Sequence, residues 1–387
     1  MLTLLLALSL ANIVTAKESL TSLSIEEMRI AKAKKAMPSV ITRMHKQVDK
    51  FSQQLQQARN YTALTQLVIV HGKTLWKQAK LSFNQQQDFD DRPLYWTRLQ
   101  MSKVLRQAPI FASLLPDQQA KLLWDLELFS RGVADIDFNK NSAKKILITG
   151  FDPFFLDKNI AQSNPSGVAA LALDDLLLSM DNKNAQIQTL MIPVRFADFD
   201  QGMIEEMLTP YLKNQKIDLL VTMSMGRKNF DLERFPALRR SAKAPDNLNV
   251  FTGADKNHPL VPQLKNKKLV GAEFVEFSLP ANKMQQAQGD YKININNKVS
   301  ILEKGEVRTF YPKSISELAN KISVQGSGGG YLSNEVSYRS ILLRNKYAPI
   351  LPVGHIHTPR ISRYKSQTNK AIVQQIKAML TLAVGEI

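Results

Sequence analysis

The 387-residue sequence contains no cysteine. This absence excludes disulfide bonds, thiolate metal ligands and a cysteine nucleophile. Acidic residues are also scarce, since 34 Asp and Glu stand against 51 Lys and Arg and the formal net charge is +17. The excess is distributed, because residues 17–143 hold 19 basic and 12 acidic residues and the remaining residues hold 32 and 22. We therefore expect a solvated basic surface and no nucleic-acid partner, with nucleic-acid or membrane-surface contact as the alternative.

A hydrophobic run long enough to span a membrane comfortably is missing from the N-terminus. Residues 1–10 form a short apolar segment, which is followed by Val14-Thr-Ala16. This pattern is typical of the hydrophobic region and cleavage site of a secretory signal peptide, although the basic residues that usually precede them are absent. We expect residues 1–16 to be a signal peptide, the protein to be exported to the periplasm or secreted, and no stable membrane span. A buried N-terminal helix is the alternative.

Residues 17–143 have the periodicity of an all-helical domain. Ser24-Ile-Glu-Glu27 matches a capping box, and apolar residues then recur at three- and four-residue spacing. Further helices are predicted at 60–83 and 93–106, and a last one from Pro116 to about Gly132. No metal or nucleophile constellation occurs here, so we interpret this segment as an accessory domain. Contact of this basic domain with anionic partners is a minor alternative.

Residues 144–387 have a different pattern, in which compact apolar runs alternate with helical ones. Strands are predicted at 145–149, 187–194, 218–223, 321–324 and 350–355. Helices are predicted at 168–180, 199–212, 331–344 and 368–384. Continuous apolar strands separated by helices indicate a sheet that is covered on both faces. The predicted fold is therefore a three-layer αβα domain with a mostly parallel twisted sheet, preceded by the all-α domain.

The candidate functional residues lie in four loops at the expected carboxyl edge of this sheet. These loops are Gly150–Phe154, Gly226–Arg234, the glycine-rich turn that leads to Ser333, and Gly354–Pro359. Glycines followed by a helix start would expose backbone N–H groups beside the Ser333 hydroxyl, as an oxyanion site requires. A plain strand-to-helix turn with a capping serine is the alternative.

The series of motifs resembles the pyroglutamyl peptidases (pyrrolidone-carboxylate peptidases) over roughly the last three-fifths of the chain. The matching segments, in order, are Gly150-Phe-Asp-Pro-Phe154, Asn164-Pro-Ser166, Met225-Gly-Arg227, Glu233-Arg234, Asp246-Asn247, Phe274–Met284, Gly328–Asn334 and His355–Pro359. Any one of these segments alone would be weak evidence, whereas the ordered series at matching spacing is specific.

The resemblance implies a catalytic triad and a substrate pocket. The family cleaves an N-terminal pyroglutamyl residue from peptides with a Cys-His-Glu triad and no cofactor or metal. By the resemblance, Glu233 is the carboxylate, His357 is the histidine, and Ser333 stands at the position of the cysteine. Residues implied to bind the substrate are Phe151, Phe154, Asn164 and Tyr331. His355 occurs where relatives carry an aromatic residue, so we interpret it as a neighbour of the base.

Several positions depart from the family pattern. Met223 replaces a glutamine, Lys243 replaces an arginine, and Phe155-Leu156 replace glycines. Each departure affects recognition of the lactam ring. A serine hydroxyl also stays protonated near neutral pH, so it needs His357 as a general base during attack. The sequence therefore favours a serine-dependent hydrolase acting on peptides with a blocked N-terminus. The alternative is an impaired relative that binds peptide N-termini or cell-envelope fragments without turnover.

Overall fold

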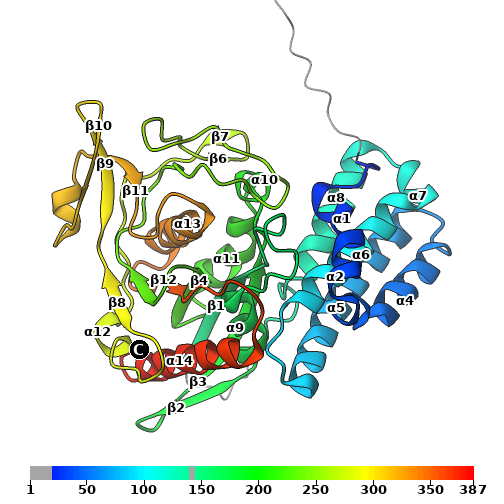
Figure 1. Cartoon of the computed structure of the whole chain (residues 1–387), viewed down its shortest axis with the longest axis horizontal. Coiled ribbons are helices and arrows are strands. Elements are labelled where there is room, and N and C mark those ends of the chain that lie inside the picture. The colour runs from blue at the N-terminus through cyan, green and yellow to red at the C-terminus, as the bar shows by residue number, and fades with distance from the viewer. Residues whose placement is uncertain (1–19, 139–143) are drawn as a thin grey trace, which may run out of the picture.

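The computed structural model describes residues 20–138 and 144–387. The predicted signal peptide, residues 1–16, lies outside the described residues. Figure 1 shows a helical region beside a larger region built around a sheet. Within the described residues, none of the helices combines the length and the apolar character needed to cross a bilayer.

The first region is all-helical, as the periodicity predicts. Ser24 Oγ accepts a hydrogen bond from Glu27 N, and Glu27 Oε2 accepts one from Ser24 N at 2.7 Å, so the predicted capping box is confirmed. Asn60 caps the long helix α5 by accepting from Ala63 N. The helices of this region are α1 (Ile25–Met28), α2 (Ile30–Ala36), α3 (Pro38–Thr42), α4 (His45–Leu55), α5 (Tyr61–Gln86), α6 (Arg92–Gln107), α7 (Pro109–Ala112) and α8 (Pro116–Phe129).

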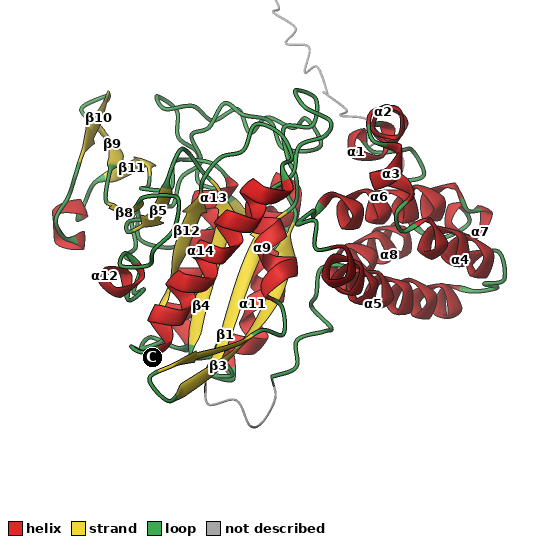
Figure 2. Cartoon of the chain, turned by 60° about the horizontal axis from the view of Figure 1, so that its bottom comes forward, coloured by secondary structure: helices red, strands yellow, loops and turns green. Residues whose placement is uncertain are grey.

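The second region is a sheet between two layers of helices, which confirms the predicted fold class (Figure 2). The sheet has the order β2-β3-β1-β4-β12-β5-β8. Its strands are β1 (Lys144–Phe151), β2 (Leu177–Met180), β3 (Lys183–Ile192), β4 (Leu219–Met225), β5 (Phe230–Glu233), β8 (Ile293–Asn296) and β12 (Val353–Thr358). The four central strands are parallel, whereas β2 runs antiparallel to β3 and β5 runs antiparallel to β12.

Two pairs of helices cover the sheet. Helices α9 (Pro165–Leu173) and α14 (Ser366–Val384) contact each other on one face, and α11 (Met203–Lys213) and α13 (Leu332–Tyr347) contact each other on the other face. The central strands are buried on both faces, which explains their continuous apolar sequence. The remaining elements are α10 (Phe196–Asp200), α12 (Ala281–Met284), a 3₁₀ turn (Ile315–Leu318) and the two-stranded sheet β6 (Gln263–Leu264) and β7 (Lys267–Lys268).

The predicted helix over 168–180 is wrong in its second half. Helix α9 ends at Leu173, and residues 177–180 form strand β2. Asp174 is extended and Asp175 has a φ of 63°, so the helical backbone cannot continue through them. Lys80 of α5 binds both carboxylates, which holds this break in place. The long-range ion pairs therefore override the local periodicity.

The strand predicted at 321–324 exists, but it does not belong to the parallel sheet. Strand β11 (Ile322–Gln325) pairs antiparallel with β9 (Val299–Glu303), which also pairs with β10 (Glu306–Phe310). These strands make a separate sheet of order β10-β9-β11. Strand β9 of the β9–β10 hairpin has a free edge, and β11 forms its hydrogen bonds there.

Candidate active site

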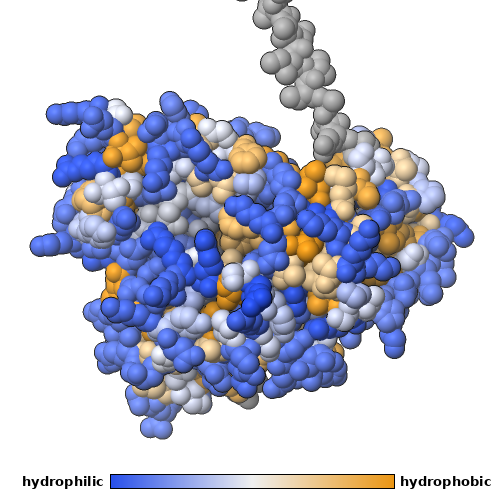
Figure 3. All heavy atoms as spheres, viewed as in Figure 1, coloured by the Kyte–Doolittle hydropathy of each residue, from blue (hydrophilic) through white to orange (hydrophobic). Residues whose placement is uncertain are grey.

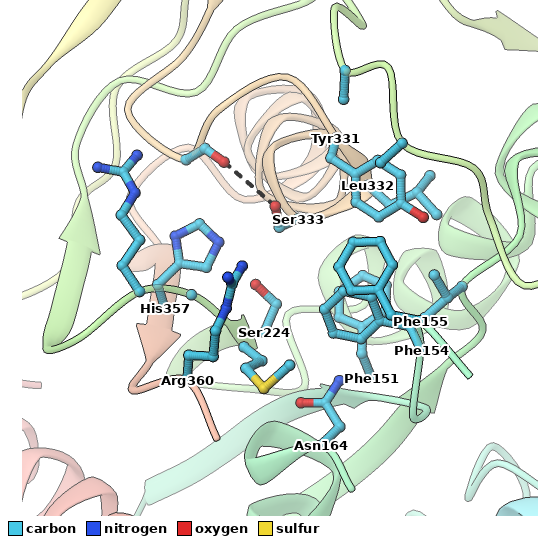
Figure 4. Close-up of a pocket in the computed structure, with 17 residues that line it drawn as sticks. Phe151, Phe154, Phe155, Asn164, Ser224, Tyr331, Leu332, Ser333, His357 and Arg360 are labelled. Carbon is cyan, nitrogen blue, oxygen red and sulfur yellow. Dashed lines mark hydrogen bonds between the residues drawn. The ribbon is translucent and has the colours of Figure 1, made fainter. Parts of the chain in front are cut away.

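A pocket opens where the carboxyl ends of β1 and β4 meet the start of α13. The cavity has a volume of about 220 Å³. Its lining combines aromatic, hydroxyl, imidazole and guanidinium groups, as the close-up in Figure 4 shows. The lining residues used below are Phe151, Phe154, Phe155, Asn164, Ser224, Arg227, Gly328, Tyr331, Ser333, His357 and Arg360. Six of the seven sequence-predicted site residues line the pocket, and the exception is Glu233.

Glu233 lies behind His357. The Nδ1 of His357 donates a hydrogen bond of 2.6 Å to Glu233 Oε1, and Asn296 Nδ2 donates one of 2.8 Å to Oε2. Burial raises the pKa of the Glu233 carboxyl, and the hydrogen bond from His357 opposes that rise. With Nδ1 bound to the carboxylate, Nε2 is the imidazole nitrogen left to accept a proton.

His357 lies on strand β12 rather than in the loop after it, because β12 extends to Thr358. It is opposite Ser224 in the β4 register. Gly226, which follows β4, allows this placement: a Cβ built on Gly226 would be 2.5 Å from His357 Cβ. The Gly226 N–H donates to Thr358 O at 2.8 Å, so it is not available to stabilise an oxyanion.

Ser333 is the second residue of α13 and faces the same pocket. Its hydroxyl donates to Gly328 O at 3.4 Å, and no hydrogen bond joins it to His357 among the residues that the structure describes. Gly328 lies close to both residues, because a Cβ built on it would be 3.5 Å from His357 Cε1. Figure 4 shows the His357 ring and Ser333 on neighbouring walls of the cavity.

The start of α13 leaves backbone donors available. The first intrahelical hydrogen bond runs from Glu335 N to Tyr331 O, and Tyr331 gives no side-chain cap. Within the described part of the chain, the N–H groups of Leu332, Ser333 and Asn334 have no protein acceptor. Helix starts carry a partial positive charge, so an oxyanion formed beside Ser333 would be stabilised there.

The aromatic side of the pocket comes from the loop after β1 and from α13. Phe154 and Phe155 lie with ring centroids 4.5 Å apart, and Phe151 stacks on Phe199 at 6.3 Å. Phe155, which sequence reasoning noted only as a departure, has a left-handed φ of 59° and lines the pocket. Tyr331 closes this side, and its hydroxyl donates to Pro245 O at 2.8 Å.

Asn164 lines the pocket, and its side-chain amide forms three hydrogen bonds within the protein. Its Oδ1 accepts from Ser166 N at 3.1 Å and Ser166 Oγ at 2.8 Å, and its Nδ2 donates to Asp152 O at 3.0 Å. This residue therefore holds the loop that carries Phe151 and Phe154. Met223, a departure position, is buried in the core and does not line the pocket.

A second serine–histidine pair lies beside the first histidine. His355 Nε2 and Ser224 Oγ are 2.8 Å apart, and His355 Nδ1 is 2.8 Å from Thr222 Oγ1. Burial lowers the pKa of His355 well below its usual value, so this imidazole stays neutral. Its partners are hydroxyls rather than a carboxylate, which leaves an imidazolium at this position without charge compensation. Sequence reasoning did not identify Ser224, because its pairing with His355 depends on the alignment of β4 and β12.

The described residues contain one close group of three carboxylates, formed by Asp135, Asp174 and Asp175. Lys80 Nζ is 2.7, 2.5 and 2.6 Å from their oxygens, respectively. The lysine ammonium thus occupies the centre of the group, which we interpret as a structural ion cluster.

Comparison with known proteins identifies relatives for both regions. Residues 10–127 match the family model "PA0049 N-terminal domain", and residues 145–270 and 283–362 match "PA0049, C-terminal domain". An uncharacterized protein of Pseudomonas aeruginosa, PA0049, is 27% identical over 394 residues, covering 79% of this chain and 71% of that protein.

The α/β region also has relatives among peptidases. A pyrrolidone-carboxylate peptidase of Staphylococcus aureus is 26% identical over 247 residues, covering 62% of this chain and 92% of that protein. The solved structure of pyrrolidone carboxyl peptidase from Thermococcus litoralis matches with a TM-score of 0.42 and 17% identity, covering 62% of this chain and 94% of that one. The α/β region is thus a distant relative of these peptidases in sequence.

Proposed function

The chain belongs to the PA0049 family, and from the pocket described above we propose that it is a hydrolase that removes a pyroglutamyl or similarly blocked N-terminal residue from peptides. The observation that carries this proposal is the 2.6 Å hydrogen bond between His357 and Glu233 at a pocket that Ser333 also lines. The distant relationship to pyrrolidone-carboxylate peptidases supports the reaction class.

In the proposed reaction, Ser333 Oγ attacks the carbonyl carbon of the blocked residue and its proton passes to His357 Nε2. The oxyanion is stabilised by the free N–H groups at the start of α13. When the carbon–nitrogen bond breaks, His357 gives its proton to the departing amine. A water molecule then attacks the ester, with His357 again as the base, and Ser333 regains its proton. Glu233 fixes the imidazole tautomer throughout.

The aromatic side of the pocket supports a small acyl group. Phe151, Phe154 and Tyr331 offer flat apolar surfaces that fit a compact ring. The loop that carries the two phenylalanines is held by Asn164, so the surface is formed before a ligand arrives.

Turnover of a fluorogenic pyroglutamyl amide tests the proposal. We expect the wild-type protein to cleave it and Ser333→Ala to lose at least about a thousandfold in kcat/KM. Ser224→Ala is the matched control, because it removes the other serine hydroxyl from the same cavity and should retain most of the activity. If Ser224→Ala lost turnover and Ser333→Ala retained it, Ser333 would not be the nucleophile and Ser224 would be the candidate instead.

A second candidate function, binding without turnover, is favoured by one observation. The Ser333 hydroxyl donates to Gly328 O instead of His357. A protein that had kept the pocket and lost catalysis would bind pyroglutamyl peptides in calorimetry and leave them intact. If wild type were inactive and Ser333→Cys alone cleaved the amide, serine catalysis would have to be abandoned in favour of this function.

A further inference from the structure

Two arginines line the pocket without any partner for their side chains. Arg227 follows β4 and Arg360 follows β12, so they leave the carboxyl ends of two adjacent parallel strands. The backbone N–H of Arg360 donates to Arg227 O at 2.5 Å, which keeps the two residues together. Both are exposed, and in the described ranges 20–138 and 144–387 neither guanidinium forms an ion pair or a hydrogen bond.

This lack of partners sets them apart from most other arginines. Several arginines elsewhere in the α/β region are paired with carboxylates at short distance, as are Arg234 with Glu276, Arg239 with Glu273 and Arg240 with Glu335. A guanidinium offers a planar fork of donors that suits a carboxylate. Two such forks directed at one cavity are therefore available to a ligand.

The pocket itself provides no negative charge to neutralise them. None of the residues found to line it is an aspartate or a glutamate. Glu233, the carboxylate of the proposed triad, already accepts from His357 through Oε1 and from Asn296 through Oε2. The cavity consequently has a positive potential that attracts anionic groups.

Arg360 lies on the histidine side of the proposed nucleophile, and its backbone N–H donates to Arg227 O. Figure 4 shows Arg360 beside His357, and the rings of Phe154 and Phe155 across the cavity from them, with Ser333 between. In the proposed reaction the aromatic side holds the acyl group, and His357 gives a proton to the departing amine. The arginines are then on the side that the departing group occupies.

We propose that the site selects substrates whose departing residue carries a carboxylate, which Arg227 and Arg360 bind. The inference deepens the proposed function and rests on it. The carboxylate can be the main-chain carboxylate of a dipeptide or the side chain of an acidic residue after the cleaved bond. Both sources present the same planar anion at about one residue's reach from the reacting carbon.

The test is calorimetry on the full-length Ser333→Ala variant, so that ligands stay intact. The probes are pyroglutamyl-glutamate and pyroglutamyl-glutamine, each as the free acid and as the C-terminal amide. At low ionic strength we expect the peptides with a carboxylate to bind about tenfold more tightly than pyroglutamyl-glutamine amide, and added salt to shrink the difference. The difference in affinity between each free acid and its amide measures the contribution of the main-chain carboxylate. The difference between the glutamate and glutamine peptides measures the contribution of the side-chain carboxylate.

Arginine variants complete the experiment. On the Ser333→Ala background, Arg227→Gln and Arg360→Gln should each weaken the preference, whereas Arg363→Gln should retain it, because Arg363 is exposed and does not line the pocket. Two results would overturn this inference: equal affinity for all four peptides, or a preference for the carboxylate that remains in both Arg227→Gln and Arg360→Gln. If wild type still cleaves the uncharged fluorogenic amide, the proposed function stands and only this inference fails. Absence of both binding and cleavage overturns the inference together with the proposed function.

Discussion

At the scale of single residues, the bond between His357 and Glu233 is what distinguishes the proposed base from its neighbour. His357 has a carboxylate that can stabilise an imidazolium, whereas His355 has only the hydroxyls of Thr222 and Ser224. Proton transfer to His355 would bury an uncompensated charge. The two rings lie 4.9 Å apart, but only His357 lines the pocket, so access to the pocket and the difference in partners both separate their roles.

Glu233→Gln should remove most of the activity while leaving the fold intact. Glu233 accepts hydrogen bonds through both oxygens, and a glutamine has only one oxygen. Its NH₂ must face either Asn296 Nδ2, which is itself a donor, or His357 Nδ1, where it favours the wrong tautomer. We expect kcat/KM to fall by about a thousandfold in the amide assay.

Asn294→Gln is a matched control for this substitution. Asn294 binds Asp231 two register positions from the Glu233–Asn296 pair and does not line the pocket. Activity within about tenfold of wild type in Glu233→Gln would show that the carboxylate does not orient the base.

At the scale of elements, the parallel pairing of β4 and β12 builds the polar side of the pocket. The register places His355 beside Thr222 and His357 beside Ser224, and Arg227 and Arg360 each lie two residues after the end of one of these strands. The close approach depends on Gly226, which leaves room for the His357 side chain.

Gly226→Ala should therefore displace His357. The added methyl would lie 2.5 Å from His357 Cβ, so β12 or the turn after β4 has to move. We expect a loss of about 1–3 kcal/mol in the free energy of unfolding, as for other overpacked sites, together with loss of turnover. Urea unfolding and the amide assay measure the two effects.

Gly385→Ala provides the control, because the nearest atoms to a Cβ there are at ordinary contact distances of 3.5 and 3.8 Å. An unchanged kcat/KM in Gly226→Ala would mean that the position of His357 relative to β4 is not critical for the reaction.

At the scale of the whole molecule, the helical region holds the loop that carries the aromatic residues. Arg98 Nη1 donates to the two carboxylate oxygens of Asp152 at 3.0 and 3.1 Å, and Arg131 Nη1 is 2.7 Å from one of them. Asp152 lies between Phe151 and Phe154, and all three charged groups are buried. Figure 3 shows hydrophobic residues gathered near the junction of the two regions, within a mostly hydrophilic face. The accessory domain thus positions one wall of the pocket.

Arg98→Met should weaken both stability and substrate binding. It removes one partner of a buried carboxylate, and such losses cost about 3–5 kcal/mol. The loop is then held less firmly, so we also expect KM to rise in the amide assay. Urea unfolding gives the free energy directly.

Arg43→Met is the comparison, since the Arg43–Asp88 pair is partly exposed and should contribute less than about 1 kcal/mol. If Arg98→Met were no more destabilising than Arg43→Met, the buried ions would not hold the two regions together.

The junction should also give the protein a pH-dependent stability. Asp91 accepts from Ser163 Oγ at 2.6 Å and from Asn164 N at 3.0 Å, and burial raises its pKa from 3.8 to about 8. At a pH between the pKa of 3.8 in the unfolded chain and the pKa of about 8 in the folded protein, Asp91 is ionised only in the unfolded chain. Rising pH in this range therefore favours the unfolded state. We expect the Tm to fall as pH rises from about 5 to about 8, and this contribution to level off above that.

Asp91→Asn should flatten part of this fall of Tm with pH, because an amide does not ionise. Its single oxygen can still accept from Asn164 N, and its NH₂ can donate to the Ser163 hydroxyl. Asp49→Asn, which alters an exposed aspartate on α4, should leave the slope unchanged. Thermal unfolding followed by circular dichroism at a series of pH values measures both. A Tm that rose with pH, or an equal slope in wild type and Asp91→Asn, would contradict this assignment.

The sequence by itself determined the order and type of the main helices and of the central parallel strands, and it predicted the three residues of the proposed triad. Caps, periodicity and buried strands are local signals, and the motifs around Glu233, Ser333 and His357 are each contained in a short segment. These signals need no knowledge of which strands pair.

Tertiary structure alone decided the features that join distant segments. The partner of His355, the convergence of Arg227 and Arg360, and the capture of β11 by β9 all depend on strand pairing. The break after α9 depends on Lys80, and the loop of Phe151 depends on Arg98 of the helical region. Each of these contacts is a balance of burial, charge and geometry between segments far apart in the chain, and no local pattern encodes it.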